Sequence, residues 1–232
     1  MALLAIGLVG FMVFALSFGG LVFWLLLRRD GPKTGVAKAD SRMQDQAALP
    51  SAAPVIEMFN GRDLEGWDFD PSIWSVRNGV ISGDQRRSGY GSSLFWRDTV
   101  SDFELRFYFR LLRGNSGIYY RAKRLANFDV GGYEFEIFTN KTGNLADNGT
   151  DRTKRRLYRA DDAEAPIDSE WHEGVIIATG ARLVHILDGK TLCDVEDADP
   201  AAPRTGTIAF ANSASGTVEF KDLRLKRLKT NP

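Results

Sequence analysis

SDFELRFYFRLL, residues 101–112, is the stretch that decides the fold of this chain. Alternate positions along it hold only apolar side chains: Phe103, Leu105, Phe107 and Phe109. Glutamate, arginine and tyrosine occupy the positions between them. Because successive side chains of a β-strand point to opposite faces of a sheet, this alternation predicts a strand with one buried face.

The same period of two recurs in later parts of the chain. It predicts strands over residues 118–122, 132–138, 174–179, 182–187, 191–195, 205–211 and 217–228. Asp188-Gly189 is typical of a hairpin turn, and GNSG at 114–117 predicts a turn after the first strand. Many short strands, with no amphipathic pattern of helical length after residue 54, predict an all-β fold. We expect an antiparallel jelly-roll sandwich over residues 55–232.

The N-terminal segment has a different composition. Residues 2–27 contain no charged side chain, and Trp24 stands near the end of this run. As a helix the run would extend about 39 Å, more than the ~30 Å hydrocarbon core of a bilayer. We therefore predict one transmembrane helix over residues 1–29. A cleaved signal peptide is the alternative, but the segment lacks a basic n-region and a small-x-small cleavage site.

Residues 30–54 lack aromatic side chains and are rich in Ala, Pro, Gly and polar residues, which predicts a flexible tether about 25–30 Å in reach. Five basic residues follow the uncharged run closely in the sequence: Arg28, Arg29, Lys33, Lys38 and Arg42. The positive-inside rule then predicts a single-pass protein of a bacterial inner membrane with its globular domain in the cytoplasm. A periplasmic domain remains the alternative, because long domains translocate despite such charges.

Small residues mark one face of the predicted membrane helix. Ala15 and Gly19 are four positions apart, Gly20 follows, and Trp24 lies one turn further on. Such a face allows another helix to approach closely, so we expect the helix to pack against an integral membrane protein partner. The alternative is the ordinary glycine content of a helix that contacts only the lipid bilayer.

The composition excludes several classes of function. Lys and Arg total 30, and Asp and Glu also total 30, so no net charge attracts the chain to nucleic acid. The chain has two histidines and one cysteine, Cys193, which excludes a multi-histidine metal site and an internal disulfide. We predict no metal and no cofactor.

Six motifs, in the same order, resemble the 3-keto-disaccharide hydrolase domain, also called domain of unknown function 1080, of the concanavalin A-like lectin and glucanase superfamily. They are EMFNGRDLEGW (57–67), WSVRNGVISG (74–83), DFEL with NSGI and Arg121 (102–121), GYEFEI (132–137), EW with Gly180, His185 and LDG (170–189), and GTI with VEF and LRL (206–225). The resemblance covers residues 56–228. It implies two curved antiparallel sheets with sugar bound on the concave face.

Paired glutamates on one predicted strand are the candidate catalytic groups. Glu134 and Glu136 are two positions apart, so they point to the same face about 6–7 Å from each other. This separation suits paired carboxylates that act on glycosides. We expect Tyr119 and Arg121 on a neighbouring strand, with Arg121 as charge partner and third catalytic candidate and Tyr119 as a stacking surface for sugar. The alternative is that alternate glutamates simply form the solvated face of a sheet.

Asn115 and His185, which match motifs of the family, are further candidates for substrate binding. One departure from the family concerns residues 209–216, AFANSASG, where the family has a histidine and an acid. Alanine and asparagine do not titrate near neutral pH and cannot transfer a proton there.

Two functions therefore stay open. The first is a non-catalytic binding or scaffolding subunit of a membrane protein complex, able to contact carbohydrate. The second is a hydrolase or lyase of 3-keto-disaccharides that uses Glu134 and Glu136.

Overall fold

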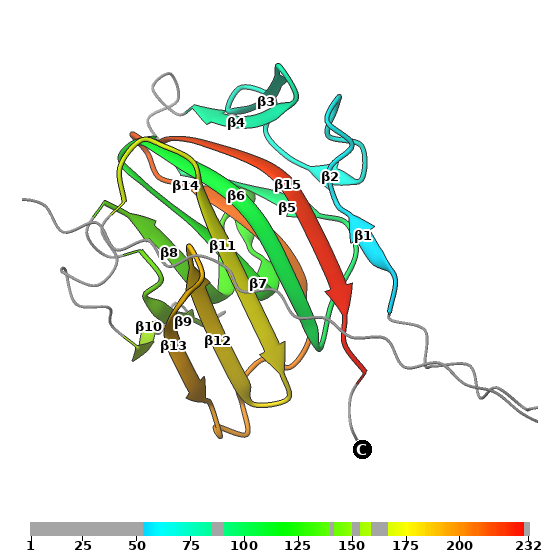
Figure 1. The fold of residues 1–232 in the computed structure, drawn as a ribbon, viewed down its shortest axis with the longest axis vertical. Coiled ribbons are helices and arrows are strands. Elements are labelled where there is room, and N and C mark those ends of the chain that lie inside the picture. The colour runs from blue at the N-terminus through cyan, green and yellow to red at the C-terminus, as the bar shows by residue number, and fades with distance from the viewer. Residues whose placement is uncertain (1–52, 85–90, 140–141, 150–153, 159–166, 230–232) are drawn as a thin grey trace, which may run out of the picture. The chain divides into compact units, whose positions relative to one another are not determined.

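The computed structural model describes residues 53–84, 91–139, 142–149, 154–158 and 167–229 (Figure 1). The predicted transmembrane helix, with Ala15, Gly19, Gly20 and Trp24, lies outside the described residues, as does nearly all of the predicted tether. Within the described ranges, no helix has the length and hydrophobicity needed to span a bilayer.

The described part of the chain is an all-β sandwich of two antiparallel sheets, as the alternating pattern predicts. Eight described strands form the first sheet. Seven of them lie in the order β13 (Lys190–Glu196), β12 (Arg182–Leu187), β11 (His172–Thr179), β6 (Phe103–Arg113), β15 (Thr217–Arg227), β4 (Val80–Asp84) and β3 (Trp74–Arg77). The eighth, β1 (Val55–Glu57), pairs with β15. Seven described strands form the second sheet, in the order β10 (Lys154–Tyr158), β9 (Leu145–Asn148), β8 (Val130–Phe138), β7 (Asn115–Arg124), β14 (Thr207–Asn212), β5 (Ser92–Trp96) and β2 (Trp67–Asp68). In Figure 1, β11, β6 and β15 lie in front of β8, β7 and β14.

The strand that decides the fold occupies the middle of the first sheet. Strand β6 pairs with β11 on one side and with β15 on the other. The four apolar side chains at its alternate positions are fully buried, as expected. The turn after it differs from the expectation, because β7 begins at Asn115 and only Gly114, with φ 78°, separates the two strands. A glycine adopts this left-handed conformation without strain, so one residue is enough to lead the chain from the first sheet into the second.

Aromatic rings from the two sheets interlock in the core. Phe107 of β6 meets Phe135 of β8 edge to face, with ring centroids 5.6 Å apart. Phe220 of β15 meets Phe210 of β14 at 4.7 Å in the same geometry. Edge-to-face contact is favoured because the positive ring edge meets the negative ring face. These ring pairs show which face of each sheet is internal. In the second sheet, the residues that alternate with these core residues along each strand therefore point outward.

The hairpin of β11 and β12 packs closely on the central strand. Gly174 of β11 is the register partner of Phe107, and a Cβ atom on Gly174 would lie only 2.2 Å from the Cζ atom of that ring. The missing side chain therefore provides the space that the ring occupies. Asp188 and Gly189 form the predicted hairpin turn between β12 and β13, both with positive φ, as a type I′ turn requires.

Candidate functional site

A row of small side chains crosses the outer face of the second sheet. Gly117 of β7 is the register partner of Ala211 in β14, and Ala211 is the partner of Ser93 in β5. Their neighbours in sequence, Ile118, Phe210 and Leu94, point into the core, so these three residues face outward. Three adjacent strands with almost no side-chain volume leave a shallow floor, which we call the shelf.

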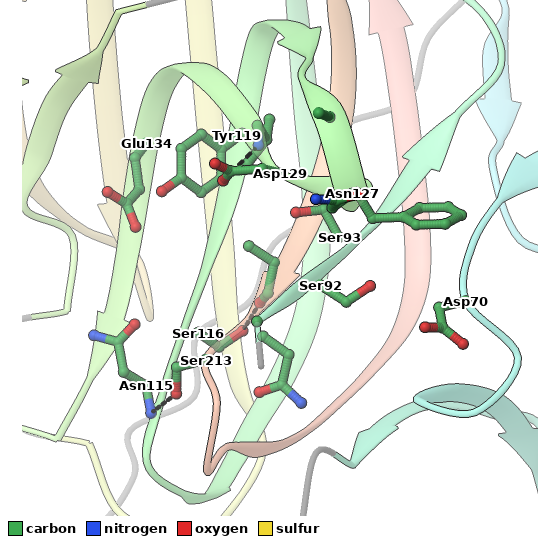
Figure 2. A pocket seen from close by; sticks show the side chains of 16 residues that line it. Asp70, Ser92, Ser93, Asn115, Ser116, Tyr119, Asn127, Asp129, Glu134 and Ser213 are labelled. Atoms are coloured by element: carbon green, nitrogen blue, oxygen red, sulfur yellow. Dashed lines mark hydrogen bonds between the residues drawn. The ribbon is translucent and has the colours of Figure 1, made fainter. Parts of the chain in front are cut away.

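Two of the three shelf residues, Ser93 and Ala211, line a pocket of about 850 Å³. Figure 2 shows Glu134 and Tyr119 on one side of this pocket and Asp70 on the opposite side. A short 3₁₀ turn, η1 (Ala126–Phe128), lines it as well, together with Asp129. The size falls within the ~300–1,000 Å³ range of small-molecule sites.

The wall formed by η1 is braced by an arginine. Asn127 and Phe128 both have left-handed backbone conformations, with φ 55° and 56°, which bulky residues rarely adopt. The Arg124 guanidinium lies 4.3 Å from the centroid of the Phe128 ring and 5.4 Å from that of Phe95. This cation–π stack holds the strained turn against the second sheet.

Three polar side chains converge at one end of the pocket. Asn148 of β9 donates from Nδ2 to Glu134 Oε2 at 2.7 Å and to the Tyr119 hydroxyl at 3.0 Å. Glu134 and Tyr119 are register partners on β8 and β7. Gly117 makes room for this cluster, because a Cβ atom there would lie 2.9 Å from Glu134 Oε1. Only 7% of Glu134 is exposed.

Tyr119 keeps its proton in this environment. Burial raises the pKa of its phenol well above the ordinary value, and the negative charge of Glu134 raises that pKa further. A protonated phenol beside a carboxylate gives the pocket one hydrogen-bond donor and one acceptor in direct contact.

Glu136 is separated from this cluster. It points to the outer face like Glu134, but its carboxylate accepts a hydrogen bond from Asn144 Nδ2 at 2.7 Å and lies 3.9 Å from the Arg156 guanidinium. Asn115, a predicted substrate-binding residue, lines the pocket and also donates to Glu136, at 3.4 Å. Of the two predicted catalytic glutamates, only Glu134 lines the pocket.

The structure corrects the position expected for Arg121. Its φ of 47° and a register shift between β7 and β8 mark a β-bulge, which reverses the alternation of side chains. The side chain is fully buried and pairs with Asp102 at 3.0 Å, while also donating to the carbonyl oxygens of Ser101 and Gly180. Burial lowers the pKa of this guanidinium. Arg121 thus joins separate loops of the sandwich and is not the charge partner of Glu134.

His185 also differs from its predicted role in substrate binding. It is fully buried between the sheets, where Nδ1 lies 3.1 Å from the Gly143 carbonyl oxygen and Nε2 lies 3.0 Å from the Tyr120 hydroxyl. A carbonyl oxygen can only accept, so Nδ1 carries the proton and Nε2 accepts from Tyr120. Burial lowers the pKa of His185 to about 4. The side chain is a neutral part of the core and has no surface that a ligand in the pocket can touch.

Sequence reasoning missed several residues that line the pocket or hydrogen-bond to its lining. Asn148 belongs to β9, a strand that no alternating pattern predicts. Ser92 and Asn212 come together only through the pairing of β5 with β14. Asp129 precedes β8 by one residue, and its position beside a predicted strand was the only available signal.

Comparison with known proteins agrees with this architecture. The family of 3-keto-alpha-glucoside-1,2-lyase-like domains matches residues 54–226. The chain belongs to this family. No curated protein matches the lyase-like domain at a significant level.

Solved structures share the fold of this lyase-like domain. A candidate glycosyl hydrolase from Parabacteroides distasonis is 17% identical, with a TM-score of 0.60 over 75% of this chain and 94% of that one. The carbohydrate-binding module CBM66 from Bacillus subtilis is also 17% identical, with a TM-score of 0.56 over 69% and 95%. The lyase-like domain is therefore a β-sandwich of the type found in sugar hydrolases and carbohydrate-binding modules.

Residues 209–216, the segment that the sequence analysis expects to depart from the family motifs, contribute to the pocket. Ala211, Asn212 and Ser213, at the end of β14 and in the following turn, line the pocket, and none of them titrates near neutral pH. Among the described residues, no cluster of three or more His, Cys, Asp or Glu side chains is arranged to hold a metal ion.

Proposed function

We propose that this protein binds carbohydrate in the pocket above the shelf and does not cleave it. The observation that carries the proposal is the shelf itself, a floor without bulky side chains that is flanked by the Glu134–Asn148–Tyr119 cluster. A hydroxylated ring fits against such a floor, and its hydroxyl groups can donate to the carboxylate of Glu134.

The surroundings of Glu134 favour binding over catalysis. A glycosidase of the common type needs a pair of carboxyl groups, one on each side of the scissile glycosidic bond. Glu136, the predicted second carboxylate, is engaged by Asn144 and Arg156 away from the pocket lining. The other carboxyl groups of the lining are Asp129, which accepts a hydrogen bond from the Val130 backbone N–H, and Asp70 on the opposite side of the pocket. The segment of β14 that faces Glu134 across the shelf contributes alanine and asparagine, which transfer no protons.

Calorimetric titration of the full-length chain in mild detergent tests the proposal, with a panel of glucosides and glucose disaccharides. Glu134→Gln keeps the shape of the side chain and removes its charge. Since a hydrogen bond to a charged group contributes about 1.5–3 kcal/mol, we expect a loss of affinity of roughly 10–100-fold. Glu170→Gln, at an exposed position outside the pocket, is the matched control. The proposal is wrong if no sugar of the panel binds, or if Glu134→Gln binds as well as the unchanged chain.

A lyase is the second candidate function, favoured by the contact between Glu134 and protonated Tyr119. In a 3-keto-glucoside the ketone acidifies the C2 proton, so a carboxylate base and a neighbouring acid suffice for elimination. Incubation with a 3-keto-glucoside separates the two functions. Turnover that disappears in both Glu134→Gln and Tyr119→Phe would establish the enzyme and refute the non-catalytic role.

We further propose that residues 1–29 anchor this domain in a membrane, that residues 30–54 tether it, and that the Ala15–Gly19 face contacts an integral membrane protein partner. The uncharged N-terminal run and the basic residues after it support this arrangement, with the domain in the cytoplasm. Protease digestion of sealed vesicles tests the orientation, because a cytoplasmic domain is digested only from that side. Purification in mild detergent tests the partner, and a protein that always runs alone would refute it.

A further inference from the structure

We propose that the binding site continues beyond the pocket to a second subsite, formed by Glu136 and Arg156, that binds the next sugar ring of the same ligand. This inference rests on the proposed function, because it extends the site in which Glu134 binds the first ring.

Glu136 and Arg156 lie on the same outer face of the second sheet as Glu134. Glu136 is two positions further along β8, about 6–7 Å from Glu134. Arg156 of β10 is the register partner of Ala146, and Ala146 is the register partner of Glu134, so these three residues form one row across the sheet. The small side chain of Ala146 leaves space above the row, and the Arg156 guanidinium turns toward Glu136, 3.9 Å from its carboxylate.

The second subsite adjoins the pocket. Asn115 lines the pocket and donates from Nδ2 to Glu136 Oε1 at 3.4 Å. Figure 2 shows Asn115 and Glu134 on the same side of the pocket. Gly117 of the shelf is the register partner of Glu136, and it has no side chain to separate Glu136 from the shelf. A ligand in the pocket can therefore extend over Gly117 toward Glu136.

Both charged groups are accessible and have hydrogen-bonding capacity left for a ligand. The exposed fraction is 19% for the Glu136 side chain and 37% for the Arg156 side chain. A carboxylate has about four acceptor positions, whereas Glu136 accepts hydrogen bonds from Asn144 and Asn115. A guanidinium has several N–H donors, and the 3.9 Å separation from Glu136 exceeds an ordinary hydrogen-bond length.

Neighbouring hydroxyl groups of a sugar ring complement this pair. One hydroxyl donates to the Glu136 carboxylate, and the oxygen of the next hydroxyl accepts from the Arg156 guanidinium. The distance between Glu134 and Glu136 is similar to the spacing of two linked sugar rings. The site therefore favours a ligand of at least two rings, the second of which has adjacent free hydroxyl groups.

Arg156→Met tests the second subsite by calorimetric titration of the full-length chain in mild detergent, because methionine keeps an unbranched apolar side chain and removes the donors. The probes are the tightest-binding glucose disaccharide of the panel and the methyl glucoside with the same anomeric configuration. We expect the variant to bind the disaccharide about 10-fold more weakly, the effect of one hydrogen bond to a charged group, and the methyl glucoside within about twofold of the unchanged chain. The thermal midpoint should change little, because an exposed ion pair contributes little to stability.

Arg182→Met is the matched control. Arg182 is an exposed arginine on β12 of the other sheet, paired with Asp194 at 2.6 Å, and its replacement should change neither affinity. Unchanged disaccharide affinity in Arg156→Met, or an equal loss for both sugars, would overturn the second subsite while leaving carbohydrate binding established. Absence of binding by the unchanged chain would instead refute the proposed function itself.

Discussion

Replacement of His185 by glutamine should make the stability of the domain less sensitive to acid. The folded state holds this imidazole neutral, with a pKa of about 4, whereas the side chain titrates near 6.5 in an unfolded chain. Between these two values the unfolded state binds a proton that the folded state does not. The stability that depends on neutral His185 is therefore complete above pH 6.5 and is lost progressively as the pH falls toward 4.

The size of the effect follows from the difference between the two pKa values. One pKa unit corresponds to about 1.4 kcal/mol, so the contribution reaches about 3 kcal/mol at pH 4 and about 2 kcal/mol at pH 5. His185 has no exposed surface, so solvent does not screen the effect. Glutamine does not titrate, and its amide can still donate to the Gly143 carbonyl oxygen and accept from Tyr120.

Urea denaturation of both proteins at pH 7.5, 6 and 5, followed by tryptophan fluorescence, measures this difference. Trp67 and Trp74 are buried and report global unfolding. We expect the original chain to lose about 2 kcal/mol more than His185→Gln between pH 7.5 and pH 5. Carboxylates that titrate in both proteins cancel in this comparison. Parallel losses in the two proteins would refute the assignment of a neutral, buried imidazole.

Two substitutions test the packing of the sandwich. Arg121→Met should destabilise the domain by about 3–5 kcal/mol, because it leaves the buried carboxylate of Asp102 without its charge partner; a loss below about 1 kcal/mol in urea denaturation would contradict this. Gly174→Ala should cost about 1–3 kcal/mol, because its Cβ atom would overlap the Phe107 ring, and a thermal midpoint equal to that of the original chain would show that the ring moves aside freely.

The sequence predicts the sheets of this protein better than its site. Alternation over residues 101–112 identifies β6 because each strand of a two-layer sandwich has one buried face. The same rule also predicts the burial of His185, which lies two positions from both Leu183 and Leu187 on the inner face of β12. The resemblance to the family predicts that this histidine binds substrate, whereas the alternation along β12 predicts a position in the core.

Arg121 could not be placed from the pattern. A β-bulge inserts one residue without a sequence signal, and the side chains after it change faces. The partners of Glu134 were also inaccessible, because β9 brings Asn148 to it from a short strand, LADN, without β-branched residues. Pocket residues on β5, β7, β8 and β14 meet only through long-range strand pairing, which one sequence does not specify.

The pairing of β1 with β15 has a mechanical consequence for a domain connected through its N-terminal side. Only three residue pairs join β1 to the sheet, from Val55 with Lys226 to Glu57 with Arg224. A pull on residue 53, directed away from the sheet edge, would peel off these pairs and extend the chain by about 10 Å. It would then reach Met58, which is buried in the core and bonded through its backbone to Leu223. Under a pulling force, strand β1 would therefore detach from the sheet first. The pocket, which lies on the other sheet, would keep its structure at that stage.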